Sequence, residues 1–294
     1  MSIIIDSKTR LLVQGITGSA ARHHTKLMME YGTKIVAGVR PGAGGTKVHG
    51  IDIFDTVKEA MHAQQPNATI LFIPAKVMKY AAFEALDAGL KTLVMVSEHI
   101  PLHDTMEIIS RANQCHARVI GPNTPGVISP SERCKVGFLP SAYYLPGHVG
   151  VASRSGTLTY EIVSRLSKVG IGQSACFGIG GDPIVGTPFP DMLRLFQSDP
   201  ETQVILLIGE IGGSMEEEAA ELVRKGIITK PVVAYISGRT APSDKKMGHA
   251  GAIIIGDRGT IASKLDAFER AGIPVAEIPN HVVGLVEDAF RKIK

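Results

Sequence analysis

Tryptophan is absent from the 294-residue sequence, and phenylalanine and tyrosine together make up only 5% of it. So few aromatic rings disfavour a protein that stacks nucleic-acid bases on its surface. The sequence also lacks a charge surplus of either sign, because 31 lysines and arginines face 28 aspartates and glutamates, a net charge of +3. Nucleic acid is therefore not expected as a partner, although a local basic patch could hold a small polyanion.

Long hydrophobic runs and closely spaced cysteines are also missing. No run of about 18 apolar residues occurs, so no membrane span is expected. Asp6, Lys8 and Arg10 interrupt the apolar N-terminal stretch, so no signal peptide is expected either. The three cysteines lie far apart, which favours neither a disulfide framework nor a metal site. We expect a cytoplasmic protein with no membrane partner and no metal ligands of its own.

Glycine, in contrast, is abundant, with 32 residues. Short apolar runs alternate with amphipathic stretches along the first 120 residues. Crossovers of this length between strands predict a parallel sheet with helices on both faces, and strands buried on both faces are apolar throughout. The expected strands are residues 10–14, 34–39, 69–73, 92–96 and 118–120, and the expected helices are residues 24–31, 57–64, 77–87 and 103–115.

The alternation pauses between residues 121 and 147, where five prolines and little helical periodicity predict a linker. It then resumes, so both halves are predicted to be α/β domains of similar size. The strands expected in the second half are residues 148–153, 174–179, 204–209, 232–236 and 275–277, and the expected helices are residues 158–169, 190–197, 215–225, 260–271 and 281–294.

Two glycine-rich turns follow expected strands in the first half. QGITGS (residues 14–19) predicts N–H groups at a helix start that attract phosphate, although it lacks a complete nucleotide-binding motif and could be a plain tight turn. GVRPGAGGTK (residues 38–47) lacks the acidic residue with which dehydrogenases hold the ribose of NAD, and offers Arg40 and Lys47 instead. This pattern disfavours NAD and favours a ligand with additional phosphate, unless both cations are simply solvated.

Two similar turns occur in the second half, in SRSGTLTYE (residues 153–161) and GIGGDP (residues 178–183). A strand, a small-residue turn and a helix again predict an anion site. The carboxyl ends of parallel strands meet at one edge of a sheet, where α/β proteins bind ligands. The turns therefore predict a cleft at that edge, with close packing of strand and helix as the alternative reason for the small residues.

A carboxylate and a histidine are the candidate reactive groups. In IGEIGG (residues 208–213), Glu210 ends an apolar strand, whereas the glutamates at 216–218 are expected to be solvated in a helix capped by Ser214. In GRTAPSDKKMGHAGA (residues 238–252), small neighbours leave His249 unshielded, as attack on a bulky phosphate requires, although a lone histidine is more often structural. Pairing with Glu210 would fix its tautomer and leave one ring nitrogen exposed.

In this order, these segments closely resemble the α subunit of succinyl-CoA synthetase (succinate–CoA ligase) from Met1 to Lys294. The most specific matches are SRSGTLTYE with GIGGDP, IGEIGG and GRTAPSDKKMGHAGAI. The resemblance implies an α/β protein with an N-terminal Rossmann-like CoA-binding domain (residues 1–125), a linker (126–146) and a flavodoxin-like ligase domain (147–294) that carries a phosphohistidine.

The resemblance also implies roles for individual residues. His249 would be the phosphorylated histidine and Glu210 would orient it. The residues expected to hold its phosphate are Ser155, Gly156 and Thr157. The residues expected near the carboxylic acid are Tyr160, Asn123 and Thr124. The residues expected to contact CoA are Thr17, Gly18, Ser19, Ala20, Arg40, Ala43, Lys47, Val96, Ser97 and Glu98.

The sequence departs from the family at three of these positions, of which the first is Ala20, where the usual SQGT is replaced by SAAR (residues 19–22). Ala43 stands where the family commonly has a lysine that contacts CoA, so Arg22, Arg40 or Lys47 is the candidate for the missing charge. Thr124 replaces a usual cysteine near the place where the acyl group reacts. The residues expected to form and hold the phosphohistidine are all present.

The activity implied is the joining of a small carboxylic acid to CoA, driven by hydrolysis of ATP or GTP. Succinate is the default acid, with malate or another small acid anion as the alternative. The nucleotide and Mg²⁺ would bind mainly on a β subunit with an ATP-grasp domain, in a heterodimer or heterotetramer, and a loop at residues 243–248 would carry the phosphohistidine between two sites. The other hypotheses are a CoA sensor without catalysis and, less favoured by the residues, an NAD-dependent dehydrogenase.

Overall fold

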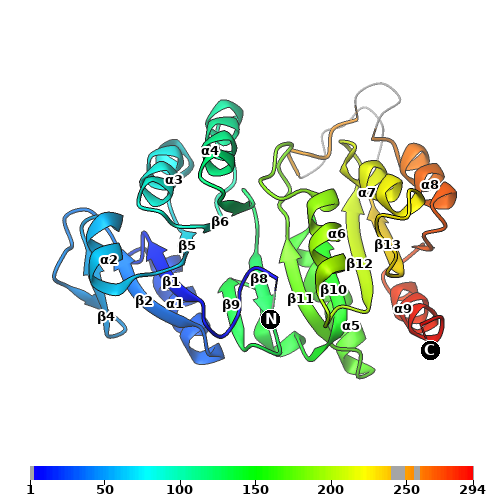
Figure 1. The fold of residues 1–294 in the computed structure, drawn as a ribbon, viewed down its shortest axis with the longest axis horizontal. Coiled ribbons are helices and arrows are strands. Elements are labelled where there is room, and N and C mark those ends of the chain that lie inside the picture. The colour runs from blue at the N-terminus through cyan, green and yellow to red at the C-terminus, as the bar shows by residue number, and fades with distance from the viewer. Residues whose placement is uncertain (1–2, 240–248, 255–258, 294) are drawn as a thin grey trace.

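The protein is described by a computed structural model at residues 3–239, 249–254 and 259–293, which form two sheets with helices on their faces (Figure 1). The strands of the first sheet are β1 (Arg10–Gln14), β2 (Lys34–Val39), β3 (Lys47–Val48), β4 (Ile51–Phe54), β5 (Ala68–Leu71), β6 (Thr92–Met95) and β7 (Arg118–Ile120).

The first sheet has the order β3-β4-β2-β1-β5-β6-β7, and all its pairs are parallel except β3 with β4. Without the short edge strand β3, this is the 3-2-1-4-5-6 order of a Rossmann fold. The order reverses between β1 and β5, and α/β sheets bind ligands beyond the carboxyl ends of their strands at such a reversal. The fold therefore places a ligand-binding edge after β1 and β5.

Helices cover both faces of the first sheet. Three helices on one face bury apolar side chains in a common core, and α1 packs on the other face, where Met28 is fully buried. The helices are α1 (Ser19–Tyr31), α2 (Val57–Gln64), α3 (Met78–Asp87) and α4 (Leu102–Gln114), with a short 3₁₀ helix η1 (Ala75–Val77) before α3.

The second sheet combines five parallel strands with two antiparallel strands at one edge, in the order β14-β13-β12-β10-β11-β8-β9. Its parallel part has the 2-1-3-4-5 order of flavodoxin. The strands are β8 (Gly126–Ser129), β9 (Cys134–Gly137), β10 (Pro146–Ser153), β11 (Gln173–Gly178), β12 (Val204–Glu210), β13 (Val232–Ser237) and β14 (Val275–Ala276).

The helices of the second domain also divide between two faces. On one face α5 and α9 pack together, and on the other α6, α7 and α8 form a row. The helices are α5 (Gly156–Lys168), α6 (Phe189–Ser198), α7 (Met215–Arg224), α8 (Ile261–Arg270) and α9 (His281–Arg291). The Rossmann-like and then flavodoxin-like arrangement expected from the sequence is thereby confirmed.

The main difference from the sequence prediction lies in the stretch expected to be a linker, residues 126–146. It contains β8 and β9, a hairpin that pairs with β11 and forms the edge of the second sheet nearest to the first domain (Figure 1). Gly126 and Gly137 face each other so closely that a Cβ on Gly126 would lie 2.1 Å from the carbonyl oxygen of Val136. Both strands are short and lie among glycines and prolines, which is why the sequence pattern did not reveal them.

The hairpin also joins the two domains. Thr33, which precedes β2, donates a hydrogen bond of 2.7 Å from its hydroxyl to the carbonyl of Lys135 in β9 and accepts one of 2.9 Å from the N–H of Lys135. One cluster of buried apolar residues continues from the first sheet through β9 into the second sheet. The two domains therefore share a continuous core. Their boundaries at residues 125 and 147 stay a prediction.

Other bounds agree closely with the expected elements. The strands at 10–14, 34–39 and 118–120 and the helix at 57–64 are confirmed as expected, but α1 begins at Ser19 rather than at residue 24. The earlier start matters because it places the QGITGS turn directly at a helix N-terminus. In the part of the chain that the structure describes, no helix is both long and apolar enough to cross a membrane.

The packing of α6 on the second sheet can be tested at Gly150, in the middle of β10. A Cβ at this position would lie 2.4 Å from the ring of buried Phe196. We expect Gly150→Ala to lower the free energy of unfolding by about 1–3 kcal/mol, as overpacking of a core does, measured by urea denaturation. Gly284→Ala is the control, because Gly284 lies inside α9 with open space around it. It should leave stability unchanged or raise it by up to about 1 kcal/mol.

Candidate active site

Glu210 and His249 form the centre of the site. Glu210 ends β12 with its side chain 7% exposed, and its Oε2 lies 2.7 Å from Nδ1 of His249, whose side chain is 34% exposed. A hydrogen bond at Nδ1 fixes the ring orientation and makes Nδ1 the donor, which leaves the lone pair on Nε2. The pairing that the sequence suggested is therefore present, with one imidazole nitrogen free to react.

The pair also shifts the basicity of the imidazole. The hydrogen bond to Glu210 raises the pKa of His249 above its ordinary value, and the negative charge of Glu210 adds to this. Partial burial and the nearby charge of Arg154 act in the opposite direction. His249 is therefore a somewhat stronger base than a free histidine, and its protonation depends on the charges around Glu210.

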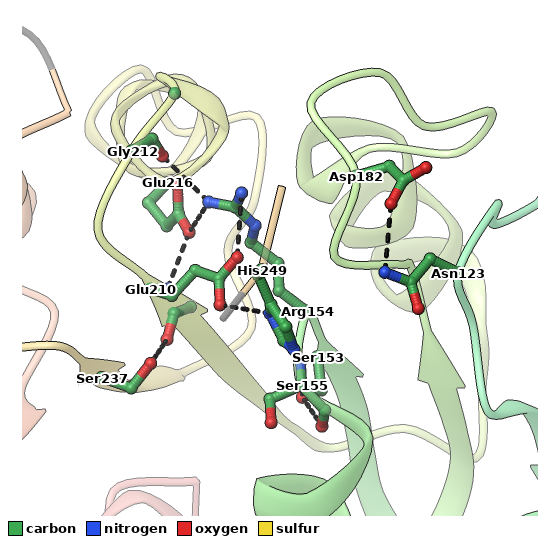
Figure 2. Close-up of polar contacts among 12 residues, drawn as sticks. Asn123, Ser153, Arg154, Ser155, Asp182, Glu210, Gly212, Glu216, Ser237 and His249 are labelled. Carbon is green, nitrogen blue, oxygen red and sulfur yellow. Dashed lines mark hydrogen bonds and ion pairs between the residues drawn. The ribbon is translucent and has the colours of Figure 1, made fainter. Parts of the chain in front are cut away.

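Arg154 lies behind this pair, directly after β10, with its side chain 1% exposed. Its Nη2 lies 3.0 Å from Oε1 of Glu210 as an ion pair, and its Nη1 donates to the carbonyl of Gly212 at 2.9 Å and to Oε1 of Glu216 at 3.2 Å. Figure 2 shows the guanidinium reaching between the Glu210 carboxylate and the start of α7. The Glu210 carboxylate is thus held by a cation on one oxygen and by the imidazole on the other.

Glu216 corrects one sequence expectation. Of the glutamates at 216–218, expected to be solvated, Glu216 is fully buried and accepts a hydrogen bond of 3.1 Å from the N–H of Glu210. Its other oxygen lies 2.6 Å from Nζ of Lys264, a fully buried lysine of α8. Lys264 also contacts Glu217 at 2.9 Å. Ser214 begins α7 as expected, but its hydroxyl donates to the side chain of Glu218 at 2.7 Å rather than capping a backbone N–H.

Two glycines let the backbone approach the imidazole and the guanidinium. A Cβ on Gly181 would lie 2.9 Å from Nδ1 of His249, and a Cβ on Gly251 would lie 2.5 Å from Nη2 of Arg154. The N–H of Gly251 donates to the carbonyl of Gly181 at 2.9 Å, which connects the histidine segment to the turn after β11. The GIGGDP and GHAGA motifs therefore need glycine for close contact with the reactive pair.

Asp182 connects this site to the end of the first domain. Its Oδ1 accepts a hydrogen bond of 3.0 Å from the amide of Asn123 (Figure 2). Burial raises the pKa of Asp182, while the hydrogen bond from Asn123 and the charge of His249 partly offset this. Sequence reasoning predicted Asn123 near the acid but did not single out Asp182, although the GIGGDP motif contains it.

The residues expected to hold phosphate lie at the start of α5. Ser155 is its N-cap and accepts a hydrogen bond of 3.3 Å from the N–H of Leu158. Gly156 and Thr157 occupy the first turn, where helical N–H groups have no acceptor within the helix. In the next turn, Tyr160 packs its ring against Tyr143 at 6.2 Å between centroids. This end of α5 is an anion-attracting helix terminus that directly follows Arg154.

Thr124 is the predicted acid-site residue with the least access. It is 1% exposed, and its hydroxyl donates to the carbonyl of Gly178 and accepts from the N–H of Gly126. Both bonds stay within the second sheet and the segment that leads into it. The threonine that replaces the family's cysteine therefore has a structural hydrogen-bonding role in this chain.

The residues expected to contact CoA lie at the ligand-binding edge of the first sheet. Gly18 and Ser19 begin α1, next to Thr17 and Ala20, and Val96, Ser97 and Glu98 follow β6. A cavity of about 280 Å³ opens at the same edge, lined by residues of β1, β2 and α3, with Arg40 among them. The lining is mostly apolar and includes Gln14, Val39, Ile73, Val77 and Tyr80.

Two of the candidate cations in this region differ in their environment. Lys47, in β3, pairs with Asp52 at 3.0 Å, so its charge is partly compensated within the hairpin. Arg40 lines the cavity itself. Ala43, in the position of the missing lysine, turns its carbonyl toward the hydroxyl of Thr46 at 2.6 Å. Arg40 is therefore the better-placed cation beside the cavity.

Other features do not add to the site. Among the residues that the structure describes, no group of three or more histidine, cysteine, aspartate or glutamate side chains could hold a metal ion. A charged groove of about 750 Å³ between α7 and α8 contains none of the residues predicted for the site. The loop at 243–248, expected to move, lies outside the described residues.

Comparison with known families agrees with this geometry. A model of the CoA binding domain matches residues 6–99, and a model of the CoA-ligase domain matches residues 152–273. The fold and the site together define a subunit of a CoA-dependent ligase.

Close relatives specify the family. The chain is 50% identical over 98% of its length, and 99% of the relative's, to subunit α 2 of the ADP-forming succinate–CoA ligase of Archaeoglobus fulgidus. It is 46% identical over 99% of its length, and 96% of the relative's, to the α subunit from Staphylococcus epidermidis. The chain belongs to the α-subunit family of succinate–CoA ligases, and is thus a subunit of an acid–CoA ligase that acts with a β subunit.

Solved structures support the fold. An ATP citrate lyase of Methanosaeta concilii, in complex with (3S)-citryl-CoA, matches 98% of this chain with a TM-score of 0.88 at 24% identity. A dinucleotide-forming acetyl-coenzyme A synthetase of Ca. Korarchaeum cryptofilum matches 96% with a TM-score of 0.74 at 22% identity. The chain spans 50% of the citrate lyase chain and 59% of the synthetase chain.

Glu210→Gln tests how the carboxylate acts on the imidazole. Glutamine keeps the shape but removes the charge, so the charge-assisted hydrogen bond that raises the pKa of His249 is lost, and this pKa should fall. The ring signals of His249 in a pH titration by NMR measure this. Glu287→Gln, at an exposed glutamate of α9, should leave the His249 titration unchanged. An unaltered titration in Glu210→Gln would contradict the assignment of the raised His249 pKa to Glu210.

Proposed function

We propose that this chain is the α subunit of a succinate–CoA ligase that works through a phosphohistidine at His249. The observation that carries the proposal is the 2.7 Å contact between Nδ1 of His249 and Glu210, which leaves Nε2 as the nucleophilic nitrogen. The half-buried ring, held by a buried carboxylate beside a helix N-terminus, is suited to accept and return a phosphoryl group.

The reaction then proceeds in three transfers. Nε2 attacks the terminal phosphorus of a nucleoside triphosphate, and the nucleoside diphosphate leaves. The phosphoryl group passes from His249 to a carboxylate oxygen of the acid, which converts a poor leaving group into phosphate. The CoA thiol attacks the resulting acyl phosphate, and thioester and inorganic phosphate are released. Dividing one difficult acylation into easier steps is the purpose of covalent catalysis.

The start of α5 is the proposed phosphate site. Ser155, Gly156 and Thr157 present the first N–H groups of the helix, whose dipole favours negative charge. Arg154 precedes them but is occupied by Glu210, Glu216 and Gly212. Backbone N–H groups, rather than a mobile cation, would therefore stabilise the transferred phosphate.

The first domain is proposed to hold CoA along its ligand-binding edge. The cavity beside Arg40 suits a flat apolar ring, and Arg40 would supply charge that the family lysine at position 43 does not supply here. A series of contacts leads from this cavity to the reactive pair. The Ser97 hydroxyl donates to the carbonyl of Ile73 at 2.6 Å, the Ser97 carbonyl accepts from the N–H of Asn123 at 2.9 Å, and Asn123 bonds Asp182.

The nucleotide, ATP or GTP, and Mg²⁺ are proposed to bind on the β subunit, through an ATP-grasp domain. In the described part of this chain, no group of three or more histidine, cysteine, aspartate or glutamate side chains could hold a metal ion. The complex would be an αβ heterodimer or an α₂β₂ heterotetramer.

Phosphorylation tests the central step. Incubation of the complex with triphosphate labelled at its terminal phosphate should give an acid-labile label on this chain, because phosphohistidine is stable in base and hydrolysed in acid. His249→Ala should carry no label. His281→Ala is the control, since His281 begins α9 and takes no part in the site. Absence of label in the wild-type complex would support a CoA sensor without catalysis and end the ligase proposal.

A panel of acids tests the substrate. With CoA and ATP, we expect the complex to form nucleoside diphosphate faster with succinate than with malate or other small acid anions, measured as kcat/KM for CoA-dependent release. Turnover of malate with failure of succinate would retain the mechanism and overturn the choice of acid. NAD-dependent oxidation of hydroxy acids serves as the negative control.

A further inference from the structure

Five charged or titratable side chains from five parts of the second domain follow one another through its interior. The buried charge chain, as we name it, consists of Lys264, Glu216, Arg154, Glu210 and His249. The contacts are 2.6 Å from Lys264 to Glu216, 3.2 Å from Glu216 to Arg154, 3.0 Å from Arg154 to Glu210 and 2.7 Å from Glu210 to His249. The first four side chains are at most 7% exposed, so their charges act on each other with little screening by water.

Arg154 occupies the middle of this chain and is held on several sides. Its Nη1 is fixed by the carbonyl of Gly212 at 2.9 Å and by Glu216, and its Nη2 faces Glu210. Gly251 leaves room for Nη2, since a Cβ there would lie 2.5 Å from it. An arginine held in this way beside the Glu210–His249 pair differs from a surface ion pair, because its side chain is 1% exposed and water screens its charge little.

Lys264 determines how strongly the positive charge of Arg154 acts on Glu210. Without a second cation, the negative charge of Glu216 would offset the positive charge of Arg154 at Glu210. Lys264 lies 2.6 Å from Glu216 and neutralises it from the other side, while Glu217 is 22% exposed and partly screened. The electrostatic potential at Glu210 is therefore set largely by the positive charge of Arg154.

We propose that Arg154 is a positioning residue that acts through Glu210, so that the Glu210–His249 pair does not take up a second proton at neutral pH and Nε2 of His249 stays unprotonated. The inference rests on the proposed phosphohistidine function and assigns a role that goes beyond it. Arg154 itself contacts neither substrate nor the transferred phosphate.

The proton count shows why this matters. With one proton shared by the pair, Nδ1–H donates to the Glu210 carboxylate and Nε2 has its lone pair. A second proton gives either an imidazolium beside the carboxylate or a protonated Glu210 that donates to Nδ1, and in both cases Nε2 carries hydrogen. Either form is unable to attack phosphorus. A positive charge beside Glu210 disfavours both.

Among the residues that the structure describes, the charged groups that face His249 lie at the ends of three strands. Glu210 at the end of β12 and Asp182 after β11 favour the protonated ring, and Arg154 after β10 opposes it. Behind them, Glu216 on α7 and Lys264 on α8 modulate Arg154. Arg154 is the cation nearest to the pair among the described residues of the buried charge chain, so its removal should have the largest effect on the proton uptake of the pair.

The pH dependence of phosphorylation tests the inference in the assembled enzyme. In Arg154→Met, we expect the midpoint of the acidic limb of the single-turnover phosphorylation rate to lie about one pH unit higher than in the wild type. At pH values below both midpoints, the rate should be about tenfold lower than that of the wild type. Near pH 9 the two rates should be similar. A purely structural role would instead lower the rate by the same factor at every pH.

Three further variants make the test specific. Arg154→Lys keeps the charge, so its acidic limb should stay near that of the wild type although its rate falls, because lysine cannot bridge three acceptors. Glu216→Gln removes a negative charge and should move the limb to lower pH, the opposite direction, which also serves if Arg154→Met does not fold. Arg165→Met, at a partly exposed arginine of α5 that pairs with Glu161, should leave the profile unchanged.

Two results would overturn the inference and one would overturn only its premise. The inference fails if Arg154→Met and Glu216→Gln keep the wild-type acidic limb, or if Arg154→Lys moves it as far as Arg154→Met. Absence of phosphohistidine in the wild-type complex would contradict the proposed function before any variant is compared. Thermal unfolding of each variant complex separates loss of fold from a shifted profile.

Discussion

The structure of the second domain depends on keeping one negative charge, the Glu210 carboxylate, inside the protein. A carboxylate that is 7% exposed is stable only if it is paired with fixed charges and hydrogen-bond donors. One oxygen faces Arg154 and the other the imidazole of His249, while Glu216 accepts the backbone N–H of the same residue. These partners come from β10, from the histidine segment and from α7, so one carboxylate fixes how three separate parts of the chain meet.

The two domains divide the work of binding and chemistry along the edges of their sheets. The reversal between β1 and β5 gives the first domain a cavity, which is the proposed CoA site, and the carboxyl ends of β10, β11 and β12 bring Arg154, Asp182 and Glu210 together. The contact of Asn123 with Asp182 connects the two edges. The arrangement of the proposed CoA-binding edge and the proposed nucleophile therefore follows from strand order, and the proposed chemistry follows from a few side chains at the strand ends.

Much of this arrangement could be predicted from the sequence. Continuous apolar runs predicted the parallel strands, because strands that are buried on both faces carry no polar alternation. For several of these strands the predicted first and last residues agree with the structure. The pairing of Glu210 with His249 was also suggested by the sequence, since each stands among glycines, of which Gly251 allows close approach to the site. In contrast, Glu216 and Lys264 look like ordinary surface charges of helices, and only the packing of α7 on α8 shows that each is buried by the other. The role of Thr124 was hidden for a similar reason, because its partner Gly178 lies on another strand.

The hairpin of β8 and β9 has a consequence for the border between the domains. It covers the edge of β11, and its own outer strand is held by Thr33 of the first domain. A second domain produced from residue 147 onward would leave the β11 edge as a row of unpaired N–H and C=O groups, open to pairing with another molecule. A second domain that began before Gly126 would include the hairpin that covers the edge of β11. In this protein the connection between the domains is therefore also the element that ends the second sheet and keeps it from associating with itself.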